Sequence, residues 1–367
     1  MQSFKGLRSL NPALAPLIAK TGPPTHQYGF RNVVRPQSCQ DLIDKLDLKS
    51  KYPNSANNLD IIDVFPGYGL FSTMVNFELN PRKHVLMDTN KQYVSMWRNR
   101  IDHLRERTGN SENFVLYEKD GYTWETYNDL IEKDKIIQPE TRPSSQIHDE
   151  LLIIGNLTPS KFGEALFAQW LMCCAYGNWM QKYGRVRMLC FATDHTAAKF
   201  CAQEKFTKRN KSGIKRDTFT ETSVIAVTES KELSEPDGFG FDPTVLIKDQ
   251  PVILPIKAVL PEGNPVSLLE VNPRDLSKLD IDVDLYEYLL KILMFRSSSL
   301  VIESLSHLAP GAEIDLPPKI PNEILQKSTK ELSVEEILTV YNVFNNWAFK
   351  PSFEEMVSIN DVESRRF

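Results

Sequence analysis

The sequence predicts an α/β protein: an open, mostly parallel seven-stranded sheet with helices on both faces, followed by a small all-helical domain. Between residues 59 and 227, short apolar runs alternate with amphipathic segments of helical period. This alternation is typical of parallel strands joined by crossover helices. From about residue 273 the pattern is helical throughout. Ligands of such sheets bind at the carboxyl ends of the strands, so site residues are expected there.

Each predicted strand is a short apolar run that stops at a polar or turn residue. A helix is predicted over 90–109, because Tyr93, Trp97, Ile101 and Leu104 share one face. A second, largely buried helix is predicted over 162–177. The predicted strands are 59–65, 83–88, 113–117, 150–156, 185–192, 223–228 and 265–271.

The stretch between residues 229 and 264 contains five prolines, which predict an extended excursion or hairpin rather than a helix. The predicted organisation is therefore a basic N-terminal segment, an α/β domain, a helical domain and a flexible tail. Their boundaries are 1–25, 26–272, 273–356 and 357–367.

Composition is that of an ordinary globular chain, with 41% hydrophobic and 25% charged residues. No apolar run reaches the roughly 20 residues of a membrane span. The net charge of -5 argues against a basic nucleic-acid coat, so any nucleic-acid contact must come from local patches. The five cysteines form no CxxC pair, and we expect buried free thiols.

The first 40 residues contain no Asp or Glu but hold five Lys or Arg residues. This composition is typical of a mitochondrial targeting segment. The alternative is a basic, mobile N-terminus that contacts a partner or nothing.

The stretch "DVFPGYGLFS" (63–72) has the form of a turn between a strand and a helix that cradles a nucleotide-like ligand. Asp88 ends the next strand, 19 residues after Gly69, where such folds place an acidic residue against ribose hydroxyls. Asp120 follows the third strand and could meet an adenine edge. The alternatives are a helix N-terminal carboxylate for Asp88 and a turn residue for Asp120.

Together, "DVFPGYG", "VLMD", "YEKDGYTW" and "IIGNL" resemble the successive motifs of the S-adenosylmethionine-dependent rRNA adenine N6-dimethyltransferases. The resemblance is closer to a fungal mitochondrial branch, transcription factor B, the specificity factors of mitochondrial RNA polymerase. It runs from "YGFRNVVRPQSCQDLIDKLDL" to "NNWAFKPSFEEM". It implies a class I, Rossmann-like methyltransferase sheet. The implied cofactor-binding residues are Asp63, Gly67, Gly69, Asp88, Asp120 and Asn156.

The sequence departs from the enzymes' pattern at the positions that hold the cofactor and the target base. Phe65 replaces the first glycine of the turn, where a benzyl group predicts a clash with the cofactor unless the loop shifts. The enzymes carry an aromatic ring shortly after the Asn to stack on the flipped adenine, whereas this chain has Thr158-Pro159-Ser160. The enzymes' Gln-x-Phe-Leu has become "FRNV" at 30–33. We therefore expect no catalytic residues, no required cofactor and a vestigial S-adenosylmethionine pocket.

Two features favour nucleic-acid binding instead. The stretch 205–216 carries six cations without an acid, a density that can neutralise phosphates. Tyr122 and Trp124 follow the third strand and could stack on unpaired bases. The alternatives are a solvated loop and packing against the sheet edge. The six cations are Lys205, Lys208, Arg209, Lys211, Lys215 and Arg216.

The leading hypothesis is a non-catalytic initiation factor of the mitochondrial matrix. The resemblance implies mitochondrial RNA polymerase as the partner, together with promoter DNA and especially its melted non-template strand. It also suggests that the tail over 357–367 reaches the polymerase's DNA cleft. The alternative is a mitochondrial rRNA adenine N6-dimethyltransferase that binds S-adenosylmethionine and relies on Asn156. A dinucleotide-dependent oxidoreductase is disfavoured, because Ser72 stands where a third glycine is expected.

Overall fold

The computed structural model describes residues 29–107, 112–230, 233, 240–277, 279–352 and 354–355. The chain divides into two compact units, one ending at residue 275 and one beginning at residue 276. The second unit also includes residues 202–218, which the sequence prediction placed in the α/β domain. The predicted segments 1–25 and 357–367 lie outside the described residues.

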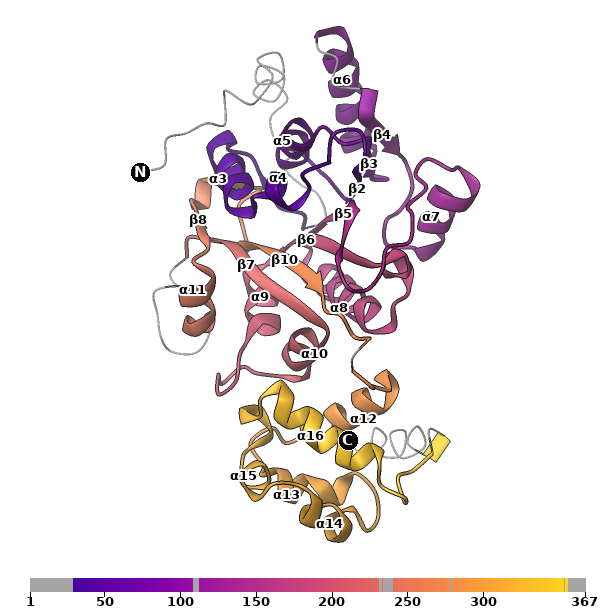
Figure 1. The fold of residues 1–367 in the computed structure, drawn as a ribbon. Coiled ribbons are helices and arrows are strands. Elements are labelled where there is room, and N and C mark those ends of the chain that lie inside the picture. Colours follow the sequence, from indigo (N-terminus) through magenta and orange to yellow (C-terminus); the bar gives the residue numbers. More distant parts are fainter. Residues whose placement is uncertain are drawn as a thin grey trace. The chain divides into compact units, whose positions relative to one another are not determined.

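The first unit is built on an eight-stranded sheet (Figure 1). All neighbouring pairs are parallel except those of β10, which runs antiparallel to β6 and β7. The seven predicted strands are present, and a short eighth, β8, extends one edge. In spatial order the strands are β4 (Phe114–Tyr117), β3 (Lys83–Met87), β2 (Asp60–Val64), β5 (Ile147–Leu157), β6 (Arg185–Thr193), β10 (Val266–Pro273), β7 (Thr220–Thr228) and β8 (Val252–Leu254).

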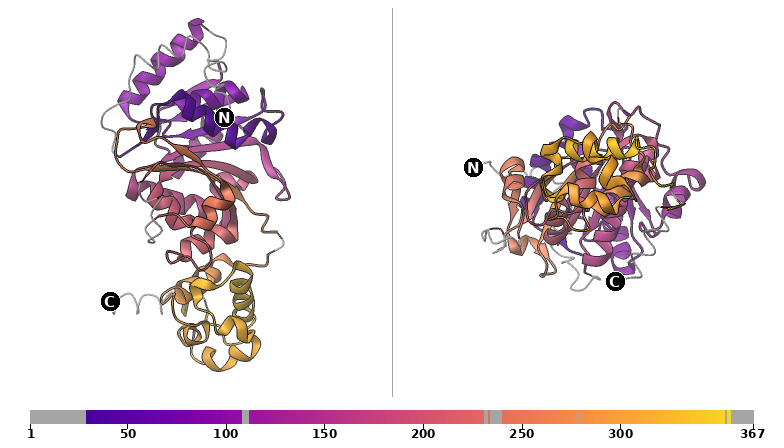
Figure 2. Two further views of the ribbon diagram at one scale, coloured as in Figure 1. Left: turned by 90° about the vertical axis from the view of Figure 1, so that its left-hand side faces the viewer. Right: turned by 90° about the horizontal axis from the view of Figure 1, so that it is seen from below.

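Helices cover both faces of the sheet, as predicted, and the left view of Figure 2 shows these layers. Neighbouring strand residues alternate between two apolar cores; Ile61 belongs to the first and Ile62 to the second. The first core receives α3 (Pro36–Leu46), α4 (Leu48–Lys51), α5 (Leu70–Leu79) and α6 (Lys91–Arg107). The second receives α7 (Trp124–Asn128), α8 (Ser160–Tyr176), α9 (Asp194–Cys201) and α11 (Pro243–Asp249).

Helix α11 contradicts the expectation that 229–264 contains no helix. Its Pro243 occupies the first turn, where a backbone N–H is not needed, so the proline favours the helix start. The Asp242 side chain accepts a hydrogen bond from Thr244 N at 2.9 Å and caps the helix. The proline count thus misled the prediction because position within the helix decides the effect of proline.

A two-stranded ribbon ties the N-terminal part of the described chain to the sheet. β1 (Asn32–Val33) pairs antiparallel with β9 (Val259–Leu260). Val34 N donates to Ala258 O at 2.9 Å and extends this pairing. The ribbon holds residues 31–33 beside the carboxyl ends of the central strands, and these residues therefore belong to the candidate site.

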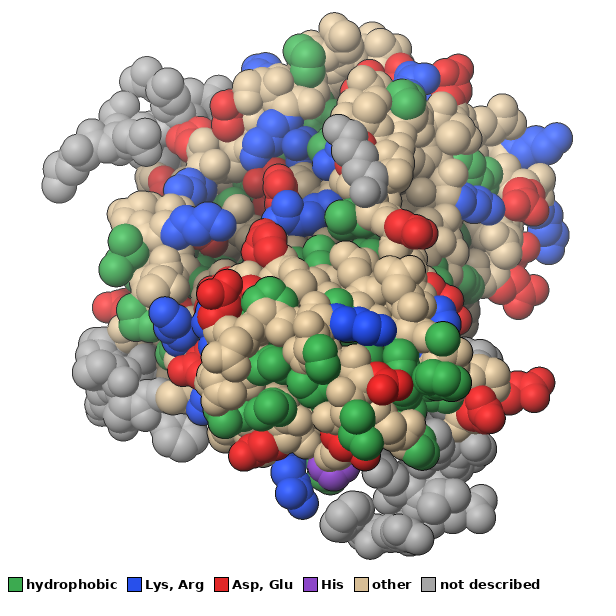
Figure 3. Space-filling view, turned by 60° about the horizontal axis from the view of Figure 1, so that its bottom comes forward, with side chains coloured by type: hydrophobic (Ala, Val, Ile, Leu, Met, Phe, Trp, Pro, Cys, Tyr) green, Lys and Arg blue, Asp and Glu red, His purple; other side chains and the backbone are tan. Residues whose placement is uncertain are grey.

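The second unit is helical. It contains α12 (Val283–Leu293), α13 (Val301–Ser304), α14 (Ala312–Asp315), α15 (Asn322–Leu325), α16 (Val334–Asn345) and most of α10 (Lys211–Phe219). Thr218 Oγ1 and Tyr286 Oη lie 2.8 Å apart, which ties α10 to α12. Figure 3 shows hydrophobic side chains spread over the face of this unit that turns toward the viewer. Among its described residues, the exposed large apolar side chains are Phe295, Ile302, Ile314 and Phe349.

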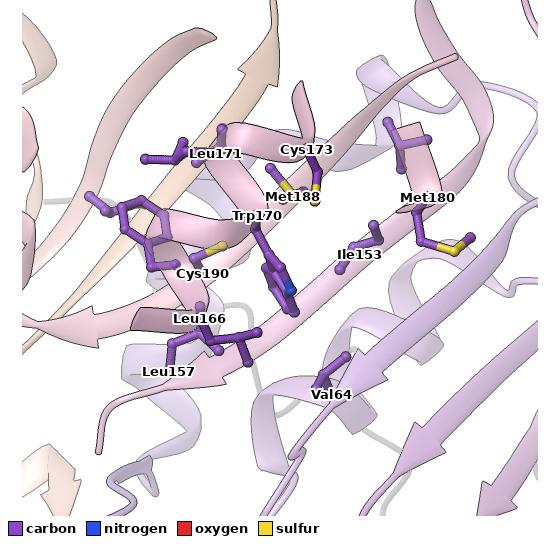
Figure 4. Packing of buried hydrophobic residues seen from close by; sticks show 14 of the residues in the cluster. Val64, Ile153, Leu157, Leu166, Trp170, Leu171, Cys173, Met180, Met188 and Cys190 are labelled. Carbon is purple, nitrogen blue, oxygen red and sulfur yellow. The ribbon is translucent and has the colours of Figure 1, made fainter. Parts of the chain in front are cut away.

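The second core of the first unit is tightly packed beneath β5 (Figure 4). Trp170 on α8 is 1% exposed and lies against Gly155, where an added Cβ would come within 2.6 Å of the ring. Cys173 and Cys190 belong to the same core. All five cysteines are buried and free, which confirms the sequence prediction.

Candidate functional site

The candidate site lies where the motif after β2 turns into α5. Phe65, Gly67 and Gly69 all have positive φ, at 57°, 55° and 71°. Glycine adopts this conformation at little cost, whereas Phe65 is strained there. The Phe65 ring is 7% exposed and packs against Phe30 and Phe162, with ring centroids 5.3 and 5.6 Å away. The residue that departs from the enzyme motif is therefore part of an aromatic cluster.

Protein side chains fill the space beside both glycines. A Cβ on Gly67 would lie 2.3 Å from Asn32 Oδ1, and one on Gly69 would lie 2.0 Å from Trp97 Cζ2. Asn32 Oδ1 accepts from Tyr68 N at 3.0 Å, and Trp97 Nε1 donates to Gly67 O at 3.1 Å. The glycines are thus required for internal packing of the turn.

Asp63 and Asp88 are both buried, at 1% and 5% exposure. Asp63 Oδ2 lies 3.2 Å from His84 Nε2 of β3. Asp88 Oδ1 accepts from Asn90 N at 2.8 Å, in a turn that leads into α6. Burial raises the pKa of Asp88 to about 6, against the opposing effect of hydrogen bonds from the Thr89 and Asn90 backbone.

Asp120 forms the same kind of turn after β4. Its Oδ1 accepts from Tyr122 N at 2.9 Å, and its carbonyl accepts from Thr126 Oγ1 at 2.7 Å. The geometry of Asp120 matches the turn role weighed as its alternative. Asp88 differs from its alternative of a helix N-terminal carboxylate, because it stabilises the turn before α6 while the N–H groups of Gln92 and Tyr93 bond to Asn90 Oδ1.

Asn156 keeps its place at the end of β5, but its amide is occupied within the chain. Its Nδ2 donates to Arg31 O at 2.9 Å, and its Oδ1 accepts from Thr158 Oγ1 at 2.6 Å. Thr158 Oγ1 in turn accepts from Arg31 N at 2.8 Å. The side chain that holds the target amine in the enzymes here holds the N-terminal ribbon.

A cavity of about 30 Å³ lies between the turn, β1 and the ends of β5 and β6. Asp63, Gly69 and Asn156 line it together with Arg31 and Asn32. The amide of Asn156 is already hydrogen-bonded, so a contact between it and S-adenosylmethionine would have to replace a bond to Arg31 or Thr158.

Tyr122 and Trp124 lie at the surface, with exposures of 42% and 39%. The Tyr122 ring stacks on Phe162, with centroids 4.7 Å apart and planes at 30°. Phe162 also meets Phe65, so the exposed tyrosine rests on the cluster that fills the turn. Trp124 begins α7. The two rings are thus accessible rather than packed away under the sheet edge.

The structure separates the six cations of 205–216, which the sequence grouped as one basic loop. Lys205 and Lys211 are exposed. Arg209 and Arg216 are each 4% exposed. Lys215 pairs with Glu287, and Arg216 Nη1 lies 2.7 Å from Asp217 Oδ1. Lys208 is partly buried.

Arg209 differs from the expectation that all six cations are available to contact phosphates. None of its three guanidinium nitrogens has a hydrogen-bond partner among the described residues. Burial lowers its pKa, with Asp217 and Glu204 acting in the opposite direction. A side chain so enclosed cannot neutralise a phosphate without rearrangement, so Lys205 and Lys211 are the accessible cations.

The sequence did not point to Asn32, Trp97 or Phe162 as parts of the site. Trp97 was predicted as one of four residues on a helix face, which gave no hint of its hydrogen bond to the turn. Asn32 belongs to the altered "FRNV" motif, and that alteration was the one available signal. Phe162 places an aromatic ring near the site six positions after Asn156.

The fold and motifs define a protein of the class I methyltransferase architecture. Residues 25–346 match the model of the family described as ribosomal RNA adenine dimethylase, and the chain belongs to that family.

Solved structures with similar folds include a dimethyladenosine transferase from Plasmodium falciparum (TM-score 0.55, 14% identity, covering 85% of this chain and 96% of that one). The 23S rRNA methyltransferase ErmE is another (TM-score 0.51, 10% identity, covering 84% and 98%). At these identities the likeness confirms the predicted fold class.

Within the family, the chain is similar to proteins named mitochondrial transcription factor 1. It is 33% identical to that of Lachancea kluyveri over 328 residues, covering 89% of this chain and 91% of the relative. It is 28% identical to that of Saccharomyces cerevisiae over 326 residues, covering 88% and 90%. The resemblance to fungal mitochondrial transcription factors is confirmed.

Neither a membrane span nor a metal-binding cluster occurs among the described residues. None of their helices combines the length and apolarity needed to cross a membrane. They also contain no group of three or more His, Cys, Asp or Glu side chains that could hold a metal ion.

Proposed function

We propose that this protein is a mitochondrial transcription initiation factor of the matrix. It binds the single-subunit mitochondrial RNA polymerase, promotes melting of promoter DNA and holds the unpaired non-template strand. Relatives named mitochondrial transcription factor 1 match about nine tenths of their own length, which supports a shared role for the whole chain.

The observation that carries the non-catalytic part of the proposal is the engagement of Asn156. Its oxygen accepts from Thr158 Oγ1 at 2.6 Å and its nitrogen donates to Arg31 O at 2.9 Å. Asn156 Oδ1 also accepts from Thr158 N at 3.4 Å, so both of its acceptor positions face Thr158 and an adenine amine would have to displace one of these bonds. Both bonds are buried, and a buried polar group left unpaired costs about 1–3 kcal/mol.

Holding a melted strand requires accessible aromatic rings and accessible cations. Tyr122 and Trp124 supply the rings, and the Tyr122 ring is already oriented by stacking on Phe162. A preoriented ring loses little conformational freedom when a base stacks on it. Sequence-tolerant stacking suits a strand whose bases differ from one promoter to the next.

The test is binding of fluorescent promoter DNA that carries a mismatched bubble, compared with the fully paired duplex. Tyr122→Ala and Trp124→Ala should each weaken bubble binding by about 1–3 kcal/mol and leave duplex binding nearly unchanged. Tyr176→Ala is the matched control, because Tyr176 is 45% exposed on α8 of the same unit. If both site variants bind the bubble like the wild type, the stacking assignment is wrong.

The second candidate is an S-adenosylmethionine-dependent mitochondrial rRNA adenine N6-dimethyltransferase, which the family match favours. An enzyme should be stabilised by about 2.7 kcal/mol when the cofactor is present at a hundred times its dissociation constant. The factor proposed here should show no such stabilisation. A rise in melting temperature with S-adenosylmethionine that Asn156→Ala abolishes would favour the enzyme.

A further inference from the structure

The strand at one edge of the large sheet is unusually exposed for an apolar sequence. β8 is three residues long, lies between Pro251 and Pro255, and pairs only with β7 among the described strands. Its central residue, Ile253, is 54% exposed. Short length and flanking prolines are devices that protect an edge from uncontrolled pairing, so the open apolar residue between them calls for a specific explanation.

The N–H and C=O of Ile253 have no hydrogen-bond partner among the described residues. Leu254 O accepts from Glu229 N at 2.8 Å, so the polar groups of Leu254 face β7. Because these groups alternate in direction along a strand, the N–H and C=O of Ile253 face the open edge. A neighbouring extended segment could take both hydrogen bonds at this one residue.

Two further isoleucines are exposed next to β8. Ile247 in the last turn of α11 is 71% exposed, and Ile256 in the short turn after β8 is 55% exposed. α11 runs into β8 through Gln250, and Figure 1 shows both at the same edge of the unit. Ile247, Ile253 and Ile256 are called the isoleucine edge below.

Among the described residues, the exposed charges around the isoleucine edge are mostly cationic, and the exposed Glu229, whose N–H bonds to Leu254 O, is the acidic exception. Lys248 and Lys257 are exposed and form no ion pair with any described residue. Lys45 of α3 is exposed and donates to Asp249 O at 2.8 Å. The Asp249 carboxylate is itself engaged, because its Oδ2 accepts from Val224 N at 2.7 Å.

We propose that the isoleucine edge docks a short, extended, acidic and apolar segment of the mitochondrial RNA polymerase. The inference rests on the proposed function for the identity of the partner. Apolar side chains would cover the isoleucines, carboxylates would pair with the three lysines, and the segment's backbone would bond to Ile253. This is strand addition limited to a few residues by the two prolines.

The same observations disfavour other occupants. A second copy of this chain would place lysines against lysines, which is destabilising. A lipid surface would cover the N–H and C=O of Ile253 without giving them partners, at a cost that a protein strand avoids.

The test measures the affinity of the cognate mitochondrial RNA polymerase for the full-length protein by isothermal titration calorimetry. Ile247→Lys with Ile253→Lys should weaken binding at least tenfold, and Lys248→Glu with Lys257→Glu should weaken it and reduce its salt dependence. Ile314→Lys is the matched control, because Ile314 is also 71% exposed but lies in the helical unit. Its affinity should equal that of the wild type.

The outcomes separate this inference from the proposed function. If the wild type itself does not bind the polymerase, the proposed function fails. If the wild type binds and both double variants bind equally well, the docking site is wrong while the function stands. Two further results would overturn the docking site. One is concentration-dependent dimerisation of the wild type in sedimentation, and the other is co-sedimentation of the wild type with anionic phosphatidylcholine–cardiolipin vesicles. Either result counts if the isoleucine double variant loses it and still binds the polymerase.

Discussion

Replacing Asp88 by asparagine should stabilise the protein, and the gain should depend on pH. Asp88 is 5% exposed, and burial raises the pKa of its carboxyl to about 6. Asparagine has nearly the same shape and keeps an oxygen that can accept from Asn90 N, a hydrogen bond of 2.8 Å in the wild type. The substitution therefore removes the buried charge and keeps the turn.

The magnitude follows from the pKa shift. A carboxyl whose pKa is higher in the folded state binds its proton more tightly there, so ionisation lowers stability as pH rises from about 4 through about 6. The shift from 3.8 to about 6 corresponds to about 3 kcal/mol above pH 6. The advantage of Asp88→Asn should grow from about 1.5 kcal/mol at pH 5 to about 3 kcal/mol at pH 7.

Urea unfolding of the wild type and Asp88→Asn at pH 5, 6 and 7 measures this advantage. Asp120→Asn is the matched control, since Asp120 makes the same kind of turn bond, to Tyr122 N, but is less buried. An advantage that does not change with pH, or a variant less stable than the wild type at pH 7, would refute the reasoning.

Three other predictions follow from the contacts of the site and of the basic segment. Gly69→Ala should cost about 2–5 kcal/mol in urea unfolding, because it adds strain at φ 71° and a Cβ 2.0 Å from the Trp97 ring. The cost of Gly69→Ala should be at least 1 kcal/mol lower in a Trp97→Leu background. If the effects of the two substitutions on the unfolding free energy simply add, the packing argument is contradicted. Arg209→Met should leave stability unchanged or raise it by up to about 3 kcal/mol, since the guanidinium is buried without a partner; a clear loss of stability would refute this. The logarithm of the DNA-binding constant falls linearly with the logarithm of the salt concentration. Lys205→Ala with Lys211→Ala should lower the steepness of this slope by about 1.5–2, whereas Arg209→Met should not change it.

The sequence predicted the sheet well because its central strands are buried on both faces. Such strands are continuous apolar runs, and "LDIIDVF" and "ELLIIGN" match β2 and β5 closely. The missed elements lie at the edge. β8 has three residues between prolines and α11 has seven, so neither is long enough to show a period.

The candidate site was only partly predictable. Positive φ at Gly67 and Gly69 follows from local sequence, and both glycines have it. The side chains that pack beside these glycines could not be predicted from the local sequence. Asn32 bonds to Tyr68 N, 36 residues away, because a two-stranded ribbon brings it there, and local patterns do not reveal that ribbon.

The basic segment shows the limit of charge counting. Six cations in twelve residues predicted a phosphate-binding segment, with a solvated loop as the alternative, when each was taken as an independent surface charge. The chain instead forms α10, buries Arg209 and Arg216, and pairs Lys215 with Glu287 of α12. Burial within the helical unit depends on tertiary packing, so it could not be anticipated from the sequence of the segment itself.

Transcription with the cognate mitochondrial RNA polymerase tests the central claim most directly. Run-off product would be measured with and without this protein, on a fully paired promoter and on the same promoter with a mismatched bubble at the start site. The account predicts that the protein is essential on the paired promoter and much less needed on the bubble. If the protein changes initiation on neither template, the account is contradicted, and methyl transfer to ribosomal RNA becomes the activity to assay.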